Sequence, residues 1–273
     1  MEGSKNILTI PMAIVLAGGL VAGAIFLRGN SNLAPAVAAE KQVGALQPPP
    51  PLSLGAITVK PIDPARDHIR GNPDADVVFI EFSDPECPFC KRFHVTMQQI
   101  INEYGKSGKV AWIYRHYPII QLHSKAPKEA EAFECAAELG GNQKFWEYAD
   151  RLFSITPSND GLDPLRLPQI AEDIGLDETA FTGCLSSGRE QARVQSDFQD
   201  GATAGVNGTP HSILMLKKAI SAKSKSAILA VMEPYRDQQG DLPTTFSMDG
   251  LRMSMNGALP VQTIKATIEA LLK

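Results

Sequence analysis

The chain has 273 residues, a formal net charge of −4 and an apolar content of 44%. Charges of neither sign gather into a long run, so the sequence lacks the basic stripe of a nucleic-acid-binding protein, and we expect no nucleic-acid partner. Without its N-terminal region the chain is still long enough for one sizeable core with an inserted subdomain. The four cysteines divide into a close pair, Cys87 and Cys90, and two distant residues, Cys135 and Cys184.

The N-terminal region predicts a membrane segment. No charged residue occurs between Ile7 and Leu27, and a helix of that length spans about 30 Å, the thickness of a bilayer core. We therefore predict a transmembrane anchor over residues 1–28. A cleaved signal peptide is the alternative, because Ala36–Ala39 has the small residues of a cleavage site. Both interpretations export the rest of the chain, so we predict a single-pass cell-membrane protein with its globular part on the extracytoplasmic side.

The next segment predicts a spacer. Residues 29–66 are rich in Ala and Pro, with four consecutive prolines at 48–51, a composition typical of semi-rigid linkers. The globular domain is predicted to occupy residues 67–273 and to open with a turn at 70–73, where Arg-Gly-Asn-Pro interrupts any regular element.

A β-α-β unit is predicted at the start of this domain. A run of β-forming apolar residues over 77–82 indicates a buried strand, and 110–117 indicates a second one. Between them, residues 87–104 have the spacing of a helix with one apolar face. The cysteine pair therefore lies where the first strand passes into the helix.

The middle of the domain is predicted to be a helical insertion, about residues 120–200, in an α/β scaffold. Its expected helices are 126–139, 144–153, 165–174, 178–185 and 190–198, separated by Gly-, Pro- and Asn-containing turns. After it we expect a strand at 212–216, a helix at 224–235, hairpin strands at 246–248 and 251–255 around Asp249-Gly250, and a closing amphipathic helix at 261–272.

The cysteine pair indicates thiol–disulfide exchange. At a helix N-terminus, free N–H groups and the helix dipole favour the thiolate of Cys87, which makes it both a good nucleophile and a good leaving group. Cys90, one turn deeper, is expected to resolve mixed disulfides. A metal site is the alternative, with Cys87 and Cys90 joined by His94 or His211. We assign no metal, and we give no role to His68, His116 and His123.

Two further features favour the redox interpretation. Glu81 is a carboxylate in an otherwise apolar run, so we expect it beneath the helix start with a raised pKa, exchanging a proton with Cys90. An edge or solvated glutamate is the alternative. Thr209-Pro210 directly precedes a predicted strand, and an X-Pro turn there can be cis. A cis turn would leave the backbone of Thr209 free to bind an extended substrate beside the cysteines.

At these residues the chain resembles the DsbA-like family of the thioredoxin superfamily, particularly its membrane-anchored bacterial branch. The resemblance rests on Ile80–Cys90, Phe145–Tyr148, Gly205–Pro210 and Asn256–Pro260. It implies a thioredoxin fold with an inserted helical domain, a nucleophilic Cys87, a resolving Cys90 and a cis-Pro210 loop. The redox-active disulfide would serve in place of any cofactor. The chain departs from the family at 219–243, where such proteins usually have a short turn.

The leading functional prediction is a dithiol oxidase that passes its Cys87–Cys90 disulfide to exported proteins with cysteines, in concert with a membrane redox partner. A disulfide reductase or isomerase, and a metal-delivery module, are the alternatives. Because the exported compartment is oxidising and both distant cysteines fall in helical segments, we also predict a structural disulfide between Cys135 and Cys184. Two buried free thiols are the alternative there.

Overall fold

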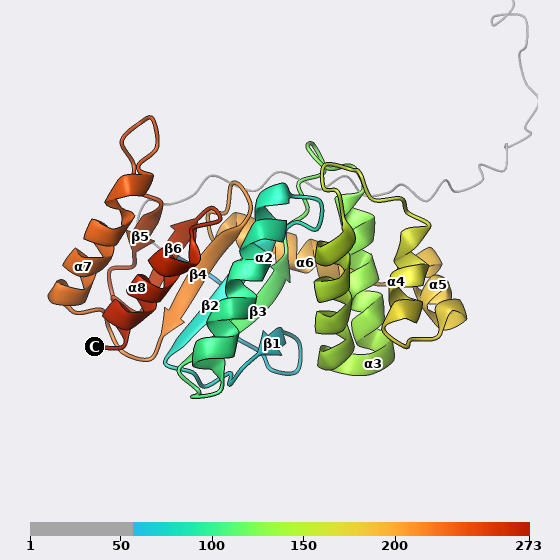
Figure 1. Ribbon diagram of the computed structural model, residues 1–273, viewed down its shortest axis with the longest axis horizontal. Coiled ribbons are helices and arrows are strands. Elements are labelled where there is room, and N and C mark those ends of the chain that lie inside the picture. Colours follow the sequence, from blue (N-terminus) through green and yellow to red (C-terminus); the bar gives the residue numbers. More distant parts are fainter. Residues whose placement is uncertain (1–56) are drawn as a thin grey trace, which may run out of the picture. The chain divides into compact units, whose positions relative to one another are not determined.

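The computed structural model describes residues 57–273 (Figure 1). The predicted anchor over residues 1–28 and the predicted linker up to residue 56 lie outside this part of the chain. Of the helices between residues 57 and 273, none combines the length and the apolar character needed to cross a bilayer.

The described residues form one mixed sheet of six strands in the order β1-β3-β2-β4-β6-β5. Its centre consists of β2 (Val77–Ser83), β3 (Val110–His116) and β4 (His211–Leu216). β2 is parallel to β3 and antiparallel to β4. These strands confirm the ones expected at 77–82, 110–117 and 212–216.

The outer strands are short. β1 (His68–Arg70) pairs with β3, and β5 (Thr244–Phe246) pairs with β6 (Arg252–Asn256), all antiparallel. The hairpin expected around Asp249-Gly250 is therefore confirmed, with its strands shifted by one or two residues. β1 occupies part of the region where only a turn was expected, because three residues are too few to show a strand period.

Alternate residues of β2 point into two separate apolar cores, as a pleated strand requires. Phe79 lies in the core beneath α2 (Pro88–Ile100) and α8 (Val261–Leu271), which cover one face of the sheet (Figure 1). Ile80 lies in the other core, where α6 (Gln191–Thr203) packs on the opposite face. A π-helical turn over Ile101–Gly105 ends α2.

The helical insertion is present and consists of α3 (Ala126–Ile155), α4 (Arg166–Asp173), α5 (Glu178–Ser187) and α6. In Figure 1, α3, α4 and α5 lie together beside the sheet. The two helices expected at 126–139 and 144–153 are the halves of α3, which is broken at Gly140 and Gly141. Gly141 has φ +70°, a conformation that glycine adopts without steric cost.

Residues 57–66 were expected to belong to the linker, but they pack against the domain. The buried guanidinium of Arg115 donates to the carbonyls of Lys60 (3.2 Å) and Pro61 (3.3 Å). The backbone N–H of Lys60 donates to the carboxylate of Asp200 at 2.8 Å. Arg115 also binds the carboxylates of Asp67 and Asp200. A fully buried guanidinium needs these partners, so Lys60 and Pro61 belong to the globular part.

The segment 219–243, where the chain departs from the DsbA-like pattern, contributes to the core. It contains α7 (Ala222–Met232) and a 3-10 turn (Glu233–Tyr235), and α7 packs against α8 (Figure 1). Ile228 and Met232 are fully buried. The helix expected at 224–235 is thus confirmed, as is the closing helix expected at 261–272.

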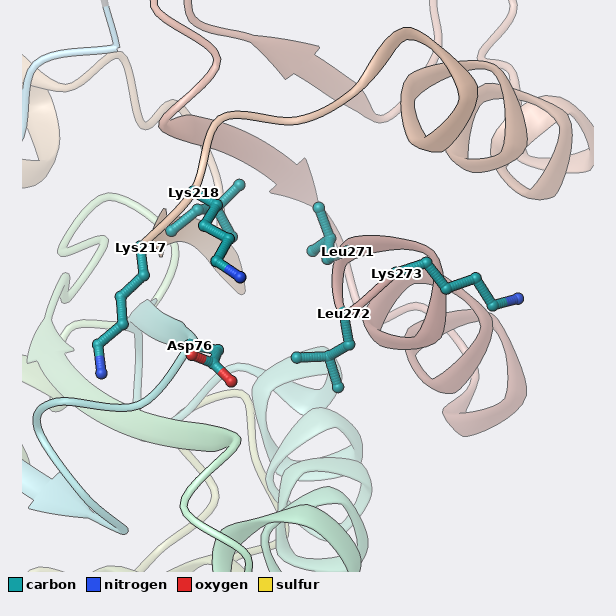
Figure 2. A pocket seen from close by; sticks show the side chains of 7 residues that line it. Asp76, Lys217, Lys218, Leu271, Leu272 and Lys273 are labelled. Carbon is teal, nitrogen blue, oxygen red and sulfur yellow. The ribbon is translucent and has the colours of Figure 1, made fainter.

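A pocket of about 90 Å³ lies at one end of the sheet, lined by Asp76, Leu216, Lys217, Lys218, Leu271, Leu272 and Lys273. Figure 2 shows Asp76 and Lys218 on one side of it and Leu271 and Leu272 on the other. Asp76 precedes β2 and Cys87 follows it, so this pocket lies at the opposite end of the sheet from the cysteine pair.

Candidate active site

Cys87 and Cys90 lie where β2 passes into α2, as the sequence predicts. After Ser83 the chain turns, and the N–H of Cys87 donates to the carbonyl of Asp84 at 3.2 Å. Cys87 is the N-cap residue of α2, with φ −77° and ψ 121°, and Pro88 is the first helical residue. Proline suits this position because its missing N–H would have had no helical partner. Both cysteines are free thiols in this structure.

The two thiols differ in accessibility. Cys87 is 4% exposed and Cys90 is fully buried. Phe89, between them, is 53% exposed. Of the two sulfur-bearing residues, only Cys87 therefore presents any surface to solvent, and it lies next to the exposed Phe89 in the chain.

The two thiols also differ in acidity. A hydrogen bond from the Cys90 thiol, together with the backbone N–H groups of Cys90 and Phe89, lowers the pKa of Cys87 to about 6. Burial raises the pKa of Cys90 well above its usual value, and the neighbouring Cys87 raises it further. At neutral pH the reduced pair therefore holds its negative charge on Cys87.

The loop before β4 lies against Cys87. The Thr209–Pro210 peptide bond is cis. The Thr209 carbonyl is 3.5 Å from the sulfur of Cys87 and accepts a hydrogen bond from it when Cys87 is protonated. The expected cis loop is thus present, and it brings Thr209 to the cysteine pair from 122 residues away in the chain.

Glu81 lies beneath the helix start and is 1% exposed. Its Oε2 accepts a 2.8 Å hydrogen bond from the indole N–H of Trp112. Burial raises the pKa of the Glu81 carboxyl to about 7, against the opposing effect of the neighbouring Ser83 hydroxyl and of the Trp112 indole N–H. The alternative of an edge or solvated glutamate is therefore wrong, because β2 is the central strand and α2 covers it.

The turn before Cys87 contains an acidic group that the sequence did not single out. The buried Asp84 accepts hydrogen bonds from the N–H of Ile119 (2.8 Å) and from Nδ1 of His123 (2.9 Å). Burial raises the pKa of Asp84. Burial also tends to lower the pKa of His123, but the hydrogen bond and charge of Asp84 outweigh that effect, so its pKa is raised. His123 thus ties the loop after β3 to the active-site turn.

A second acidic pair lies on the other side of this turn. Glu86, directly before Cys87, is fully buried and receives the N–H of Asn159 on its carbonyl (2.8 Å) and that of Leu162 on Oε1 (3.3 Å). Burial, and then a hydrogen bond with Glu86, raise the pKa of Glu129 to about 9. No local pattern could have predicted this pair, since Glu129 belongs to α3 and meets Glu86 only through tertiary packing.

The other two cysteines are joined in a disulfide, with a Cα–Cα distance of 5.8 Å. Cys135 belongs to α3 and Cys184 to α5, so the bridge lies within the helical insertion. It is separate from the active-site pair and crosslinks two helices that also share the core around Phe181.

His94 and His211 were considered as metal ligands together with Cys87 and Cys90. Nε2 of His94 lies 2.7 Å from the carboxylate of Asp150, and burial lowers the pKa of His211 to about 4. Between residues 57 and 273, the side-chain groups close enough to share an ion are His116 with Glu134 and Asp197, and Glu138 with Cys184 and Glu190. Neither group includes Cys87 or Cys90.

Solved structures with the same fold include several DsbA proteins. DsbA2 of Pseudomonas aeruginosa is 20% identical, with a TM-score of 0.55, over 78% of this chain and 97% of that one. α-DsbA1 of Wolbachia pipientis is 19% identical, with a TM-score of 0.57, over 77% and 92%. BdbD of Bacillus subtilis is 17% identical, with a TM-score of 0.57, over 80% and 100%.

Fold and site together define a thiol–disulfide oxidoreductase of the thioredoxin superfamily. The family model described as Thioredoxin matches residues 64–233. The chain belongs to this family.

Curated relatives with higher sequence identity are longer proteins. The Na⁺/H⁺ antiporter NhaA 1 of Mycobacterium sp. (strain KMS) is 32% identical over 189 residues, which are 68% of this chain and 30% of that protein. The Na⁺/H⁺ antiporter NhaA 3 of Salinispora tropica is 32% identical over 202 residues, 74% of this chain and 28% of that protein. The chain thus spans less than a third of the length of these relatives.

Proposed function

We propose that the chain is a dithiol oxidase that transfers its Cys87–Cys90 disulfide to cysteines of exported proteins. The observation that carries this proposal is the position of Cys87 at the N-cap of α2, where the neighbouring Cys90 thiol and backbone N–H groups lower its pKa to about 6. A thiolate that is stabilised in the reduced protein favours the reduced form, and a couple with a favoured reduced form is a strong oxidant. A reductase would need a less strongly stabilised thiolate at Cys87.

The residues around the pair take distinct roles in this proposal. A client thiolate attacks the sulfur of Cys87, which becomes bonded to the client while Cys90 leaves as a thiolate. The second client thiol then displaces Cys87 and completes the client's disulfide. The Thr209-Pro210 loop binds the client backbone beside Cys87, and Glu81 supplies the proton that neutralises Cys90. The two cysteines perform the redox chemistry without a cofactor.

We further propose that the protein is anchored to the cell membrane by residues 1–28, with the catalytic domain on the extracytoplasmic side. The uncharged Ile7–Leu27 segment and the Cys135–Cys184 disulfide support this location, since structural disulfides persist in oxidising compartments. After each transfer the reduced pair must be reoxidised, so the proposal requires a redox partner, which we place in the same membrane.

The reduction potential of the Cys87–Cys90 couple tests the proposed direction. Equilibration of the domain with glutathione buffers, read by tryptophan fluorescence and by alkylation, should give a potential above about −200 mV, in the range of oxidising family members. A value near about −270 mV, as in thioredoxin, would support the reductase alternative instead. Carbonate extraction of membranes tests the anchor: the full chain should stay with the lipid, whereas a cleaved signal peptide would give a released protein beginning near Ala39.

A further inference from the structure

Four polar groups meet beneath the start of α2. In the pairing of β2 with β3, Glu81 lies beside Tyr114, and Ser83, two residues further along β2, points to the same face. Cys90 packs in the same core as Tyr114, and its sulfur accepts a 3.4 Å hydrogen bond from the backbone N–H of Asp84, the residue after Ser83. All four side chains are at most 1% exposed.

Three oxygen atoms in this cluster have no hydrogen-bond partner within the described part of the chain: Oε1 of Glu81, Oγ of Ser83 and the hydroxyl of Tyr114. Buried polar atoms are rarely left unpaired. Here each hydroxyl brings one hydrogen that rotates freely, and the carboxyl brings either a proton or a lone pair. The three atoms can therefore satisfy one another, provided that the hydroxyl hydrogens point along one chain.

Ser83 is the central member of that chain. Ser83 shares the inward face of β2 with Glu81 and directly precedes Asp84, whose backbone N–H contacts the Cys90 sulfur at 3.4 Å, so its hydroxyl lies beside both groups. In keeping with this position, Ser83 acts to lower the pKa of Glu81, of Cys90 and of Tyr114. Oε2 of Glu81 is already bound by Trp112. Within residues 57–273 no hydrogen bond links the Glu81 carboxyl directly to the sulfur of Cys90, since its other oxygen has no partner.

We propose that Ser83 relays a proton between the Glu81 carboxyl and the Cys90 sulfur, and that Tyr114 positions the Ser83 hydroxyl. The proposal rests on the function proposed above and adds a residue to it. When a client thiolate bonds to Cys87, the Cys87–Cys90 bond breaks and its electron pair leaves on Cys90. Cys90 takes the hydroxyl hydrogen of Ser83 while Ser83 takes the carboxyl proton of Glu81. The net change is the transfer of one proton from Glu81 to Cys90. When Cys90 instead attacks a mixed disulfide at Cys87, the proton moves back from Cys90 to Glu81.

The experiment compares Ser83→Ala with Ser83→Thr in the full chain. Stopped-flow exchange with a cysteine peptide should be about a hundredfold slower near pH 7 in Ser83→Ala, the usual contribution of one positioned proton carrier. Ser83→Thr, which keeps the hydroxyl, should retain most of the rate. Tyr114→Phe should fall between them. Ser254→Ala is the control, because Ser254 is a buried strand serine that hydrogen-bonds to Thr245 away from the site.

Two readouts separate a relay from a structural effect. In the double variant of Ser83→Ala with Glu81→Gln, the rate should be no lower than in Glu81→Gln alone, because both changes interrupt one path. The NMR titration of the Glu81 carboxyl should shift to higher pH in Ser83→Ala, since the hydroxyl stabilises the carboxylate. Multiplicative rate losses, or an unchanged Glu81 titration, would overturn the relay.

The titration does not depend on turnover, so it also tests the relay if the wild-type chain exchanges no disulfides with the peptide. Failure of the wild-type chain to exchange would overturn the proposed function. Wild-type exchange combined with a full rate in Ser83→Ala would overturn the relay alone.

Discussion

The indole N–H of Trp112 points at the carboxylate of Glu81, 2.8 Å away, in a region of the core that water does not reach. The donor is neutral, so it stabilises the carboxylate less than a cation would, and burial keeps the pKa of Glu81 raised to about 7. This pair sets the charge beneath the cysteines, and it can be changed without touching either thiol.

Trp112→Phe should raise the pKa of Glu81 above its wild-type value, because the carboxylate loses its indole donor. Loss of that hydrogen bond should also lower the unfolding free energy by about 1–3 kcal/mol. Carboxyl NMR and urea unfolding measure the two effects. Trp146→Phe is a matched control, since Trp146 packs on Trp112 but its own N–H has no partner among residues 57–273. An equal pKa change in both variants would count against the Glu81–Trp112 bond.

Glu81 should make the stability of the domain fall as the pH rises. In the unfolded chain its pKa is about 4.3, whereas in the folded chain it is about 7. Between these values the native state binds the extra proton, so the unfolding free energy decreases from about pH 4 to 7, by up to about 3 kcal/mol. Urea unfolding of the reduced wild type and of Glu81→Gln across this range measures the effect, because subtracting the two curves cancels the titration of Cys87. A flat difference would contradict it.

The two active-site thiols should alkylate at different pH. Iodoacetamide labelling of Cys87 in the reduced wild type should follow a pKa of about 6, while Cys90 stays unreactive at neutral pH. Because the Cys90 thiol is the main cause of that low pKa, Cys87 in Cys90→Ala should titrate at higher pH than in the wild type. Cys90→Ala should still trap client proteins as mixed disulfides, and Cys87→Ala few. Equal labelling of both thiols near pH 7 would show that Cys87 is not the nucleophile and Cys90 not the resolving thiol.

Replacing both Cys135 and Cys184 by Ala should destabilise the fold and leave the active site unchanged. The bridge closes a loop of 49 residues, for which the chain-entropy model gives about 4 kcal/mol as an upper-range value. Thermal unfolding gives the loss, and the alkylation profile of Cys87 provides the control. Labelling of either residue in unfolded, unreduced protein would show that the bridge is not formed.

Shortening the chain at its N-terminal side should distinguish linker from domain. A protein beginning at residue 67 loses the two carbonyls that bind Arg115 and the N–H that binds Asp200. We expect it to unfold about 2–4 kcal/mol more easily than one beginning at residue 57, because buried charges lose hydrogen bonds. Urea unfolding compares the two. Equal stability would mean that residues 57–66 act as linker despite their contacts.

Much of this arrangement could be predicted because it depends on local patterns. The run at 77–82 is apolar enough to require a central strand, and a carboxylate within it had to be buried, which singled out Glu81. The helical spacing after Cys87 located α2, and Thr209-Pro210 before a strand indicated the cis loop. Each inference needed only neighbouring residues.

The remainder depends on contacts between distant segments. Glu86 and Glu129 are ordinary surface-type residues in the sequence and meet only because α3 packs against the active-site turn. Nothing in the sequence distinguishes Ser83 from other serines, and only the sheet and α2 together bring it near Glu81 and Cys90. Residues 57–66 have a linker-like composition, and only the buried charge of Arg115 shows that they are needed.

The loop after α3 bears on the direction from which a client arrives. Its residues Ser158, Asn159 and Asp160 all have positive φ, and hydrogen bonds attach it at one end to Glu86 and at the other to the N–H groups of Ser124 and Lys125. The loop therefore covers the side of Cys87 on which Glu86 lies. We expect a client chain to approach Cys87 from the side of Phe89 and Thr209. The helical insertion then stays fixed on the opposite side and limits the directions in which the client sulfur can meet Cys87.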